Sequence, residues 1–502
     1  MLRSIIVAAG VLRAAATRRP IAVASLAVGV LAAAVRIPRV WSDSLWQDEV
    51  ASARILREPT FASVLHRVAR TESTPPLWYA LGWLLHAAGT PIVDVRLVSV
   101  AAGAATAALV VMLARRVLPL RLAVVAGLLA ALGHEFLVHG HELRAYALLT
   151  LLSAVFALLL ARTTAPLRRR DLVALAACTA AGLLTHYFFC FTVAAGLAWI
   201  VFEPDLRGRR RVPLAAVAAG MVVTLPWLPD ALTQYHQDRF WWIGRFRLRP
   251  VVDTPLRLFT PAIRPVPLLV ACGVVFATLC VFGAIRLART SAVGRLFVAL
   301  GLGPLLLAAL VWAAGVRIFA LRNLVEIGPL VAVLAAASVA YLPQRARLTA
   351  AVAVATALAA GFFTFGTKPD AVPFGNIARV LVREGWGRRD PIAVFGGQNG
   401  FFSFRSPLEW YLPRQPELTL GRTTATPCDT VFAVVHSRKR AQRLRELGIA
   451  ESSWIDGYDV LRLRLRGWPG EEALGRPSLI TATTGHASCV SPVLAGRDRP
   501  LA

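Results

Sequence analysis

Acidic, basic and imidazole side chains that could do chemistry are gathered in three short segments of the chain. Asp48 and Glu49 lie side by side in the sequence WQDE, just after the first long apolar stretch. The other two segments are TPPLWY at residues 74–79 and HELRAY at residues 141–146. A carboxylate can take a proton from an attacking hydroxyl group, and arginine binds phosphate through charge-assisted hydrogen bonds. These residue types suit transfer chemistry at a phosphate, provided that the fold brings the segments together.

The elements that must position these segments are membrane-spanning helices. The 502-residue chain is 57% hydrophobic and has a mean hydropathy of +0.60, whereas soluble domains are about 45–50% apolar. Apolar blocks recur from residue 21 to residue 365, each with roughly the length of about twenty residues that spans a bilayer. We therefore expect a polytopic α-helical membrane module at residues 1–366 and a soluble domain at residues 367–502.

Apolar length and flanking arginines predict about eleven transmembrane helices. We place them at residues 21–35, 95–113, 122–138, 145–160, 172–184, 188–201, 212–228, 266–285, 296–314, 324–342 and 348–365. Arginine clusters such as 115–121, 168–170 and 207–211 fall in alternate turns, which the positive-inside rule assigns to the cytoplasm. This pattern predicts a cytoplasmic N-terminus and an extracytoplasmic C-terminal domain.

Two long extracytoplasmic loops are expected, at residues 36–94 and 229–265. In the first loop, the apolar stretch 77–88 is too short to span a bilayer, so we expect a re-entrant or interfacial helix begun by Pro75-Pro76. The tail has an α/β pattern, with a helix at 374–386 and buried strands at 392–395 and 430–435. The glycine-rich segment 396–400 lacks the Lys-Ser/Thr of a phosphate-binding loop, which favours an ordinary strand-to-helix turn.

The formal charge of +27 does not indicate nucleic-acid binding, because the arginines lie mainly in the turns between apolar blocks. No nucleic-acid partner is expected. The chain is rich in Arg and Ala and has only two lysines, Lys368 and Lys439, a composition typical of a GC-rich bacterial genome. Cys428 and Cys489 in the tail could form a disulfide if the tail is exported; two separate thiols is the alternative.

The predicted topology brings the three polar segments to the outer face of the membrane. Arg96, His186, Tyr187, Arg317 and Arg322 are expected at the same face. Ionisable side chains at a membrane boundary are costly unless they are hydrated or paired. Their gathering over an apolar bundle suits a reaction between a lipid-anchored phosphate and a molecule outside the cell.

The same residues resemble those of a known family. The Asp48-Glu49 pair, the Pro-Pro-Leu-x-Tyr helix start at 75–79 and the Glu-x-Arg-x-Tyr element at 142–146 are similar to motifs of bacterial GT-C glycosyltransferases. These are membrane enzymes related to protein O-mannosyltransferases and lipid A aminoarabinose transferases. Weaker similarities lie at Arg322-Asn323-Leu324 with Gly328-Pro329, and in the tail at residues 390–412.

The resemblance implies an inverting transfer of a sugar from a polyprenyl-phosphate donor to an acceptor hydroxyl at the outer membrane face. It implies that Asp48 is the general base and that Glu49 orients the acceptor or is a second base. Side chains expected to bind the donor phosphate or sugar are Arg96, Arg144, Arg322, His141, Glu142, Tyr146, His186 and Tyr187. Those expected to support the acceptor or the loops are Trp78, Tyr79, Trp241 and Trp242.

Some positions depart from the family pattern or have a structural alternative. Many relatives have histidine where this chain has Thr74, so a role of that histidine in metal binding is in doubt here. No spacing of His and Glu demands a metal site; no cofactor is assigned, and a divalent metal stays open. The arginines could instead anchor helices at the headgroups by snorkelling. His186-Tyr187 could be an interfacial cap, and Trp241-Trp242 could belong to an aromatic belt.

Two other classes of function compete with the transferase. A lipid or polysaccharide transporter or flippase would place binding residues near the membrane midplane on broken helices, whereas here the ionisable residues gather at one face. A non-catalytic envelope scaffold would explain the tail but not this gathering. The sequence leaves the sugar open between mannose and an arabinose-like pentose. It also leaves open a lipid, a polysaccharide or a protein as the acceptor.

Overall fold

The computed structural model describes residues 19–237, 243–261, 266–348, 350, 362, 374–387, 392–395, 407–412, 418–420, 430–435, 450–455, 458–464 and 478–482. By its contacts the chain forms two compact units. The first contains residues 1–41 and 55–367, and the second contains residues 42–54 and 368–502. The acidic segment with Asp48 and Glu49 therefore groups with the tail, although the sequence analysis assigned it to the membrane module.

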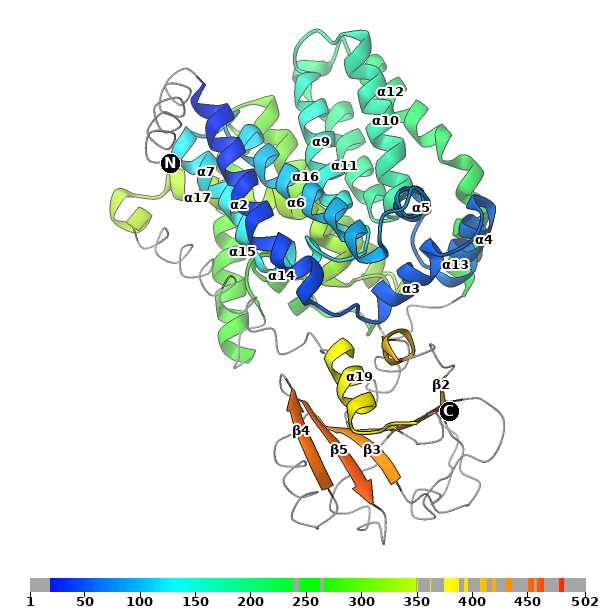
Figure 1. Ribbon diagram of the computed structural model, residues 1–502. Helices are drawn as coiled ribbons and strands as arrows, with labels where there is room; N and C mark the ends of the chain where they lie inside the picture. Colours follow the sequence, from blue (N-terminus) through cyan, green and yellow to red (C-terminus); the bar gives the residue numbers. More distant parts are fainter. Residues whose placement is uncertain are drawn as a thin grey trace, which may run out of the picture. The chain divides into compact units, whose positions relative to one another are not determined.

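The first unit is an α-helical bundle (Figure 1). Six helical stretches in the described residues are long and apolar enough to cross a membrane: Pro20–Ser42, Ile92–Ala114, Arg211–His236, Val270–Ala288, Ala292–Ala313 and Leu321–Tyr341. Three shorter apolar helices are Leu120–Leu132, Tyr146–Arg162 and Phe189–Phe202. The helical, multi-pass character predicted from hydropathy is thus observed. The count of eleven spans stays a prediction, and the span expected at 348–365 lies mostly outside the described residues.

The main helices of the bundle are given in chain order (Figure 1). They are α2 (Pro20–Ser42), α6 (Arg96–Ala114), α7 (Leu120–Leu132), α8 (His134–His139), α9 (Tyr146–Arg162), α10 (Arg169–Thr185), α11 (Phe189–Phe202), η2 (Pro204–Leu206), α12 (Arg211–Val223), η3 (Leu225–Trp227), α15 (Val266–Ala288), α16 (Ala292–Ala313), η4 (Leu321–Ile327) and α17 (Gly328–Tyr341). Helix α17 is central: nearly all its residues are buried, and it contacts α6, α7, α9, α15 and α16.

A helix break separates α7 from α8 within the segment predicted as one span. Gly133 has extended backbone angles (φ −62°, ψ 144°) and ends α7. A Cβ atom there would meet the Leu129 carbonyl oxygen at 2.6 Å and the Phe259 ring at 2.9 Å, so glycine permits the close packing. Helix ends leave backbone carbonyls without intrahelical partners. Arg36 of α2 donates to the carbonyl oxygens of Phe136 (3.0 Å) and Ala130 (3.5 Å) around this break.

The segment between α2 and α6 contains short helices in place of an extended loop. In the first unit these are α4 (Phe61–Thr71), α5 (Leu77–Ala87) and η1 (Ile92–Val95). Thr60 and Ser63 form a capping box at the start of α4, which satisfies free backbone donors of its first turn. The expected short apolar helix at 77–88 is observed as α5. It ends at Ala87, and Gly89 two residues later has a φ of 97°, which is readily adopted only by glycine.

The segment predicted as a second external loop, residues 229–265, also contains helices. The chain continues from η3 directly into α13 (Leu228–His236), so the span predicted to end at residue 228 extends to His236. Helix α14 (Leu248–Arg257) follows and packs on α15. The prediction from hydropathy did not include α13, because the polar residues Asp230, Thr233 and Gln234 interrupt its apolar pattern.

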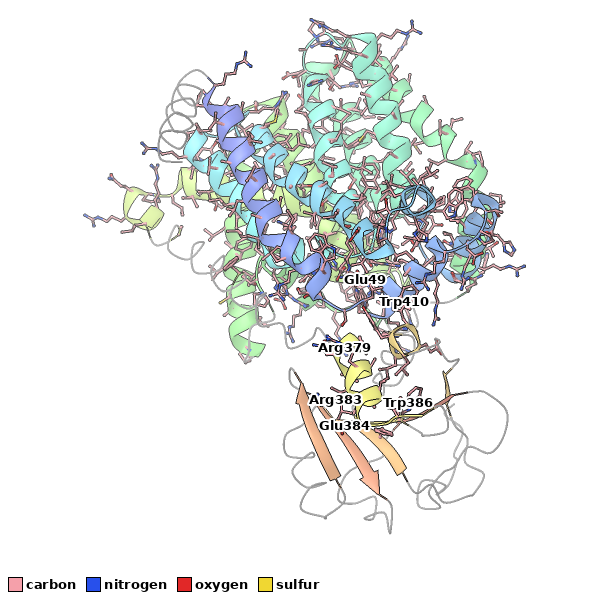
Figure 2. The ribbon with its side chains drawn as sticks, in the orientation of Figure 1. Glu49, Arg379, Arg383, Glu384, Trp386 and Trp410 are labelled. Carbon is pink, nitrogen blue, oxygen red and sulfur yellow. The ribbon has the colours of Figure 1, made fainter. Side chains whose placement is uncertain are left out.

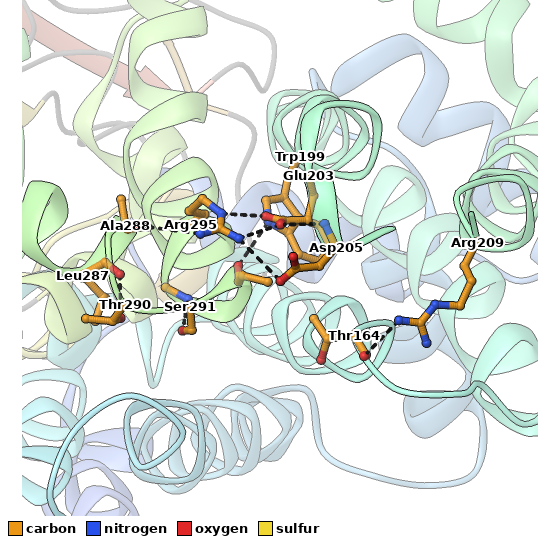
Figure 3. A network of polar contacts seen from close by, with 12 residues as sticks. Thr164, Trp199, Glu203, Asp205, Arg209, Leu287, Ala288, Thr290, Ser291 and Arg295 are labelled. Atoms are coloured by element: carbon orange, nitrogen blue, oxygen red, sulfur yellow. Dashed lines mark hydrogen bonds and ion pairs between the residues drawn. The ribbon is translucent and has the colours of Figure 1, made fainter. Parts of the chain in front are cut away.

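An ion-pair clamp joins the end of α11 to the start of α16 (Figure 3). Arg295 donates from Nε and Nη2 to the two carboxylate oxygens of Glu203, at 2.8 and 2.6 Å. Asp205 lies 3.5 Å from the same guanidinium but is mostly exposed. The Glu203 side chain is fully buried, so its charge depends on Arg295. This pairing lowers the pKa of Glu203, with the Arg295 hydrogen bond as the largest cause.

The second unit contains a six-stranded sheet with the order β2-β6-β1-β3-β5-β4. The strands are β1 (Ile392–Phe395), β2 (Leu418–Leu420), β3 (Thr430–Val435), β4 (Ala450–Ile455), β5 (Tyr458–Arg464) and β6 (Ser478–Ala482). β1 and β3 are parallel, whereas the other neighbours are antiparallel. β1 and β3 occupy the residues predicted as strands. The glycine-rich segment 396–400, Cys428 and Cys489 lie outside the described residues.

Helix α19 (Phe374–Arg383) packs against β4 and β5 (Figure 1). Its apolar residues Phe374, Ile377 and Leu381 recur at helical spacing and are buried. They join Ile392 and Phe432 of the sheet in one hydrophobic core. The polar side of α19 carries Arg379 and Arg383, and Arg383 pairs with Glu384 at 3.2 Å (Figure 2).

Replacing Arg295 by methionine should destabilise the helical bundle. The substitution leaves the fully buried Glu203 carboxylate without its cation, which we expect to cost about 2 kcal/mol, less than a fully buried pair because Arg295 is partly exposed. Thermal unfolding of the purified protein in detergent measures the loss. Asp205→Asn is the matched control, since Asp205 is exposed and more distant. Equal melting temperatures for wild type and Arg295→Met would contradict a stabilising clamp.

Candidate active site

The start of α6 places two polar side chains on one face of the bundle's interior. Arg96 is the first residue of α6, and Ser99 lies one turn later on the same face. Arg96 donates to the Val40 carbonyl of α2 at 2.8 Å, and Ser99 donates to the Glu142 carbonyl at 2.6 Å. Arg96 is only 1% exposed, so its side chain is not a surface group extended toward the lipid headgroups. α6 thus fixes both α2 and the turn that contains Glu142.

A buried network connects the second and third polar segments of the sequence, both of which belong to this unit. Arg144 donates to the Glu72 carboxylate and to the Tyr79 hydroxyl, each at 3.1 Å. Tyr79 donates to Glu72 at 2.7 Å, and the Thr74 hydroxyl lies 3.2 Å from the Tyr79 hydroxyl. Burial is the largest cause of a raised pKa for Tyr79, so its hydroxyl stays protonated. Arg144 therefore fastens the α4–α5 segment to the start of α9.

A second cluster is centred on His139, at the end of α8. Its two ring nitrogens contact Glu142 (Nδ1, 2.7 Å) and Glu135 (Nε2, 3.1 Å). Burial by itself would lower the pKa of His139, but the carboxylates of Glu142 and Glu135 outweigh it and raise the pKa to about 9. His139 is therefore an imidazolium at neutral pH, held between two acids.

Tyr146 connects these groups to a third set. Its ring lies 4.5 Å from the His139 ring and 5.8 Å from the His186 ring, centroid to centroid. The Arg144 guanidinium lies 5.9 Å from the same Tyr146 ring. Burial, and then the positive charges of Arg144 and Arg322, lower the pKa of His186 to about 3. His186 is thus neutral, and it accepts a hydrogen bond at Nδ1 from the Phe188 backbone at 3.2 Å.

Protonation at Nε2 leaves His186 as a neutral hydrogen-bond donor beside two arginines. A neutral imidazole with Nδ1 as acceptor carries its proton on Nε2. Guanidinium groups and an N–H donor together suit an anionic or hydroxyl-bearing ligand. The structure therefore places Arg144, Tyr146, His186 and Arg322 near one another; their role in binding a donor stays a prediction.

Other predicted site residues have structural contacts of their own. His141 is buried, with Nδ1 2.9 Å from the Leu137 carbonyl. Tyr187 donates to Gln234 of α13 at 2.7 Å and accepts from Trp227 at 3.0 Å, and burial raises its pKa to about 12. Trp78 is buried at the start of α5, and its indole nitrogen has no hydrogen-bond partner.

Asp48 and Glu49 belong to the second unit and form the first turn of α3 (Gln47–Leu56). Glu49 accepts from the Trp46 backbone at 3.3 Å, and Ser52 donates to the Asp48 carbonyl at 3.1 Å. Contacts to the tail hold this segment: the Leu45 backbone donates to the Tyr411 hydroxyl at 2.7 Å, and Arg54 pairs with Glu409. Acids in a first helical turn are stabilised by the helix dipole.

The structure does not place the other residues predicted at the outer face in this site. Trp241 and Trp242 lie outside the described residues, and Arg317 is exposed. Among the residues that the structure describes, no group of three or more His, Cys, Asp or Glu side chains is arranged to hold a metal ion.

Sequence reasoning missed Glu72, Glu135 and His139 as members of the cluster. Glu135 and His139 are four residues apart, and His139 and Glu142 are three apart, spacings that bring side chains together on one helical turn. That signal was available, but the segment was assigned partly to an apolar span. Glu72 had no local signal, because its partner Arg144 lies 72 residues away.

Stability should decrease as pH rises through about 9, and His139 should be the cause. The folded pKa of His139, about 9, exceeds its unfolded value of about 6.5. The stabilisation is therefore complete below the unfolded value and disappears as pH rises through the folded value. Melting temperatures of wild type and His139→Gln between pH 6 and 10 test this. We expect a steeper alkaline fall for wild type; parallel curves would refute the assignment.

Arg144→Gln should destabilise the protein more than the double variant Arg144→Gln, Glu72→Gln. The single change leaves the Glu72 carboxylate buried without its cation, which costs about 3 kcal/mol, whereas the double change removes both charges. Thermal unfolding in detergent measures both. If the double variant melts at or below the temperature of the single variant, the pair is not what holds the two segments together.

Comparison with known proteins agrees with this architecture. Residues 73–229 match the model of the family described as dolichyl-phosphate-mannose-protein mannosyltransferase. No curated protein matches the chain by sequence. The matched residues contain the second and third polar segments, together with His186 and Tyr187.

Among solved structures, the chain is similar to ArnT from Cupriavidus metallidurans in the apo state, with a TM-score of 0.52 and 14% identity over 87% of this chain and 97% of that one. The structure of ArnT bound to undecaprenyl phosphate gives a TM-score of 0.50, at 14% identity and the same coverage. The oligosaccharyltransferase AglB from Archaeoglobus fulgidus gives 0.47, at 13% identity over 82% of this chain and 62% of its own. The predicted resemblance to GT-C membrane glycosyltransferases is confirmed by the family match and the shared fold.

Proposed function

We propose that this protein transfers a sugar from a polyprenyl-phosphate donor to an acceptor hydroxyl. The observation that supports this most directly is the cluster of buried Arg144, buried neutral His186 and half-buried Arg322 in the first unit. Such a cluster suits a phosphate and its attached sugar in a bundle too apolar to bury an anion otherwise. The family model that matches residues 73–229, and so contains Arg144 and His186 but not Arg322, is described by a lipid-phosphate mannose donor, and the similar ArnT structure contains undecaprenyl phosphate.

The proposed reaction is a direct displacement with inversion at the anomeric carbon. The acceptor oxygen forms a bond to that carbon while the bond from carbon to the phosphate oxygen breaks. The bonding electrons leave with the polyprenyl phosphate, and the acceptor proton passes to the Asp48 carboxylate as general base. Glu49 orients the acceptor or is a second base.

Charge develops on the leaving phosphate as its bond to the sugar breaks. Preorganised cations beside that position stabilise the transition state more than the ground state. Arg322 and Arg144 are suited to this role, and His186 adds a neutral donor from Nε2. Arg96 is proposed to hold α2 in place beside the site through its hydrogen bond to the Val40 carbonyl. His141, Glu142 and Tyr146 are proposed to contact the donor. The aromatic residues Trp78, Tyr79, Trp241 and Trp242 are proposed to support the acceptor side and the adjoining loops.

We further propose that the site faces the outside of a bacterial cytoplasmic membrane, with a cytoplasmic N-terminus and an extracytoplasmic tail. The arginine clusters in alternate turns favour this orientation. The tail groups with the Asp48 segment, which suits a role in presenting a lipid, polysaccharide or protein acceptor. Mannose and an arabinose-like pentose are the candidate sugars.

Asp48→Asn should abolish sugar transfer and leave donor binding intact. The substitution keeps the size of the side chain, replaces one acceptor oxygen by an NH2 donor and removes the ability to accept a proton, which typically costs a factor of about 100 to 10,000 in rate. The assay follows release of polyprenyl phosphate from decaprenyl-phosphate mannose and decaprenyl-phosphate arabinose in nanodiscs, with an envelope extract as the source of acceptor.

Glu49→Gln is the matched control, because Glu49 is adjacent to Asp48 and also lies in the first turn of α3. It should reduce turnover less than Asp48→Asn. Full activity of Asp48→Asn would exclude Asp48 as the base. Folded wild-type protein that releases nothing from either donor would contradict the transferase and favour a transporter.

A further inference from the structure

Glu326 is a buried carboxyl group that the proposed reaction does not use. It lies in η4, within the apolar segment Leu321–Tyr341. Its side chain is 0% exposed, and neither carboxylate oxygen has a hydrogen-bond partner among the residues that the structure describes. In the described part of the chain no ion pair involves Glu326. By contrast, the buried acids Glu72 and Glu203, two of several, are paired with Arg144 and Arg295.

A second unsatisfied polar group lies beside Glu326. Thr192, in the first turn of α11, is 1% exposed, and its hydroxyl oxygen has no hydrogen-bond partner. The Thr192 hydroxyl neighbours the Glu326 carboxylate but does not form a well-aligned hydrogen bond with it. Cys190, which is exposed, also lies near this carboxylate.

Burying such groups without partners destabilises a membrane protein. An unsatisfied carboxyl group or hydroxyl in an apolar interior loses its hydration and gains nothing in exchange. Ionisable residues inside membrane segments are rare and usually functional for this reason. Leucine at 326 and valine at 192 would avoid the cost, so the two polar groups together indicate a ligand that completes their hydrogen bonds.

The local backbone places the pair in segments that also contain candidate site residues. η4 is a 3₁₀ helix of seven residues, longer than the three or four residues usual for such helices. It contains Arg322 as its second residue and continues into α17 at Gly328. His186, near Arg322, precedes Thr192 by six residues. The pair thus belongs to the same two segments as the candidate active site.

The chemistry of the pair selects the class of ligand. One carboxyl group and one hydroxyl are too few oxygen ligands for a calcium or magnesium ion, and no third acid or histidine joins them in the described residues. Without a neighbouring cation, the pair offers no site for a phosphate. A carboxyl group with an adjacent hydroxyl can instead exchange hydrogen bonds with neutral hydroxyl groups.

We propose that Glu326 and Thr192 form a subsite for the hydroxyl groups of the donor sugar. This inference rests on the proposed function for the identity of the donor. The arginines and His186 bind the phosphate, and the Glu326–Thr192 pair binds the glycosyl group attached to it. The subsite thereby distinguishes a loaded donor from the spent polyprenyl phosphate.

The test compares the affinity for decaprenyl-phosphate mannose and decaprenyl-phosphate arabinose with that for sugar-free decaprenyl phosphate. Dissociation constants are measured in nanodiscs for wild type, Glu326→Leu, Glu326→Gln and Thr192→Val. We expect Glu326→Leu to weaken binding of at least one loaded donor about tenfold, the effect of about 1.4 kcal/mol from lost hydrogen bonds. Glu326→Gln should weaken it less, and sugar-free binding should not change.

Two controls separate the subsite from a general structural effect. Thr179→Val removes a buried hydroxyl that already bonds to the Leu175 carbonyl at 2.8 Å, so it should leave the preference for loaded donor unchanged. Glu326→Leu should also raise the melting temperature, because it removes an unsatisfied buried group. A variant that merely misfolds would melt lower.

The outcomes distinguish this inference from the proposed function. Equal weakening of loaded and sugar-free ligands, or no weakening by any variant, overturns the subsite, as does a wild type that binds neither loaded donor better than decaprenyl phosphate. Selective weakening in a protein that binds loaded donor but transfers nothing supports the subsite and contradicts the transferase. Selective weakening with active transfer supports both.

Discussion

The arrangement of the polar cluster depends on one buried guanidinium group. Arg36 lies inside the first membrane segment, 0% exposed, and all its hydrogen bonds in the structure go to backbone carbonyls of Ala32, Ala130 and Phe136. It satisfies carbonyls that the break between α7 and α8 leaves free. A Cβ atom on Gly140 would meet Arg36 Nε at 2.1 Å, so this glycine makes room for it. Without this support the break could not persist in an apolar surrounding.

The break in turn explains why α8 can present acids and histidines to the bundle. A continuous helix from Leu120 onwards would rotate Glu135 and His139 to other directions and carry them further along its axis. The short α8 instead ends at His139, and the following turn brings Glu142 back to the same ring. Ser99 of α6 holds that turn through the Glu142 carbonyl. Helix geometry and a single arginine thus determine where the charges meet.

Some of this could be predicted from sequence, and the reasons for success and failure are physical. Apolar length located the long helices, and the short apolar stretch at 77–88 was expected as a helix because it cannot span a bilayer. Short continuous apolar runs predicted β1 and β3 with the same first and last residues that the structure shows. Glu326 was overlooked since one acid barely changes the hydropathy of a long apolar segment. The grouping of Asp48 with the tail was not predictable, because contacts such as Leu45 with Tyr411 span 366 residues.

The two histidines around Tyr146 show how the same side chain acquires opposite charge states within one cluster. His139 lies between Glu135 and Glu142 and is protonated at neutral pH, whereas His186 lies near Arg144 and Arg322 and is neutral. An imidazolium cannot accept a proton, and an imidazole whose pKa is about 3 accepts one too weakly to be a general base near pH 7. Neither histidine can therefore deprotonate an acceptor hydroxyl. If the reaction is the sugar transfer proposed here, its base must come from outside this pair, and a carboxylate such as Asp48 has the required chemistry.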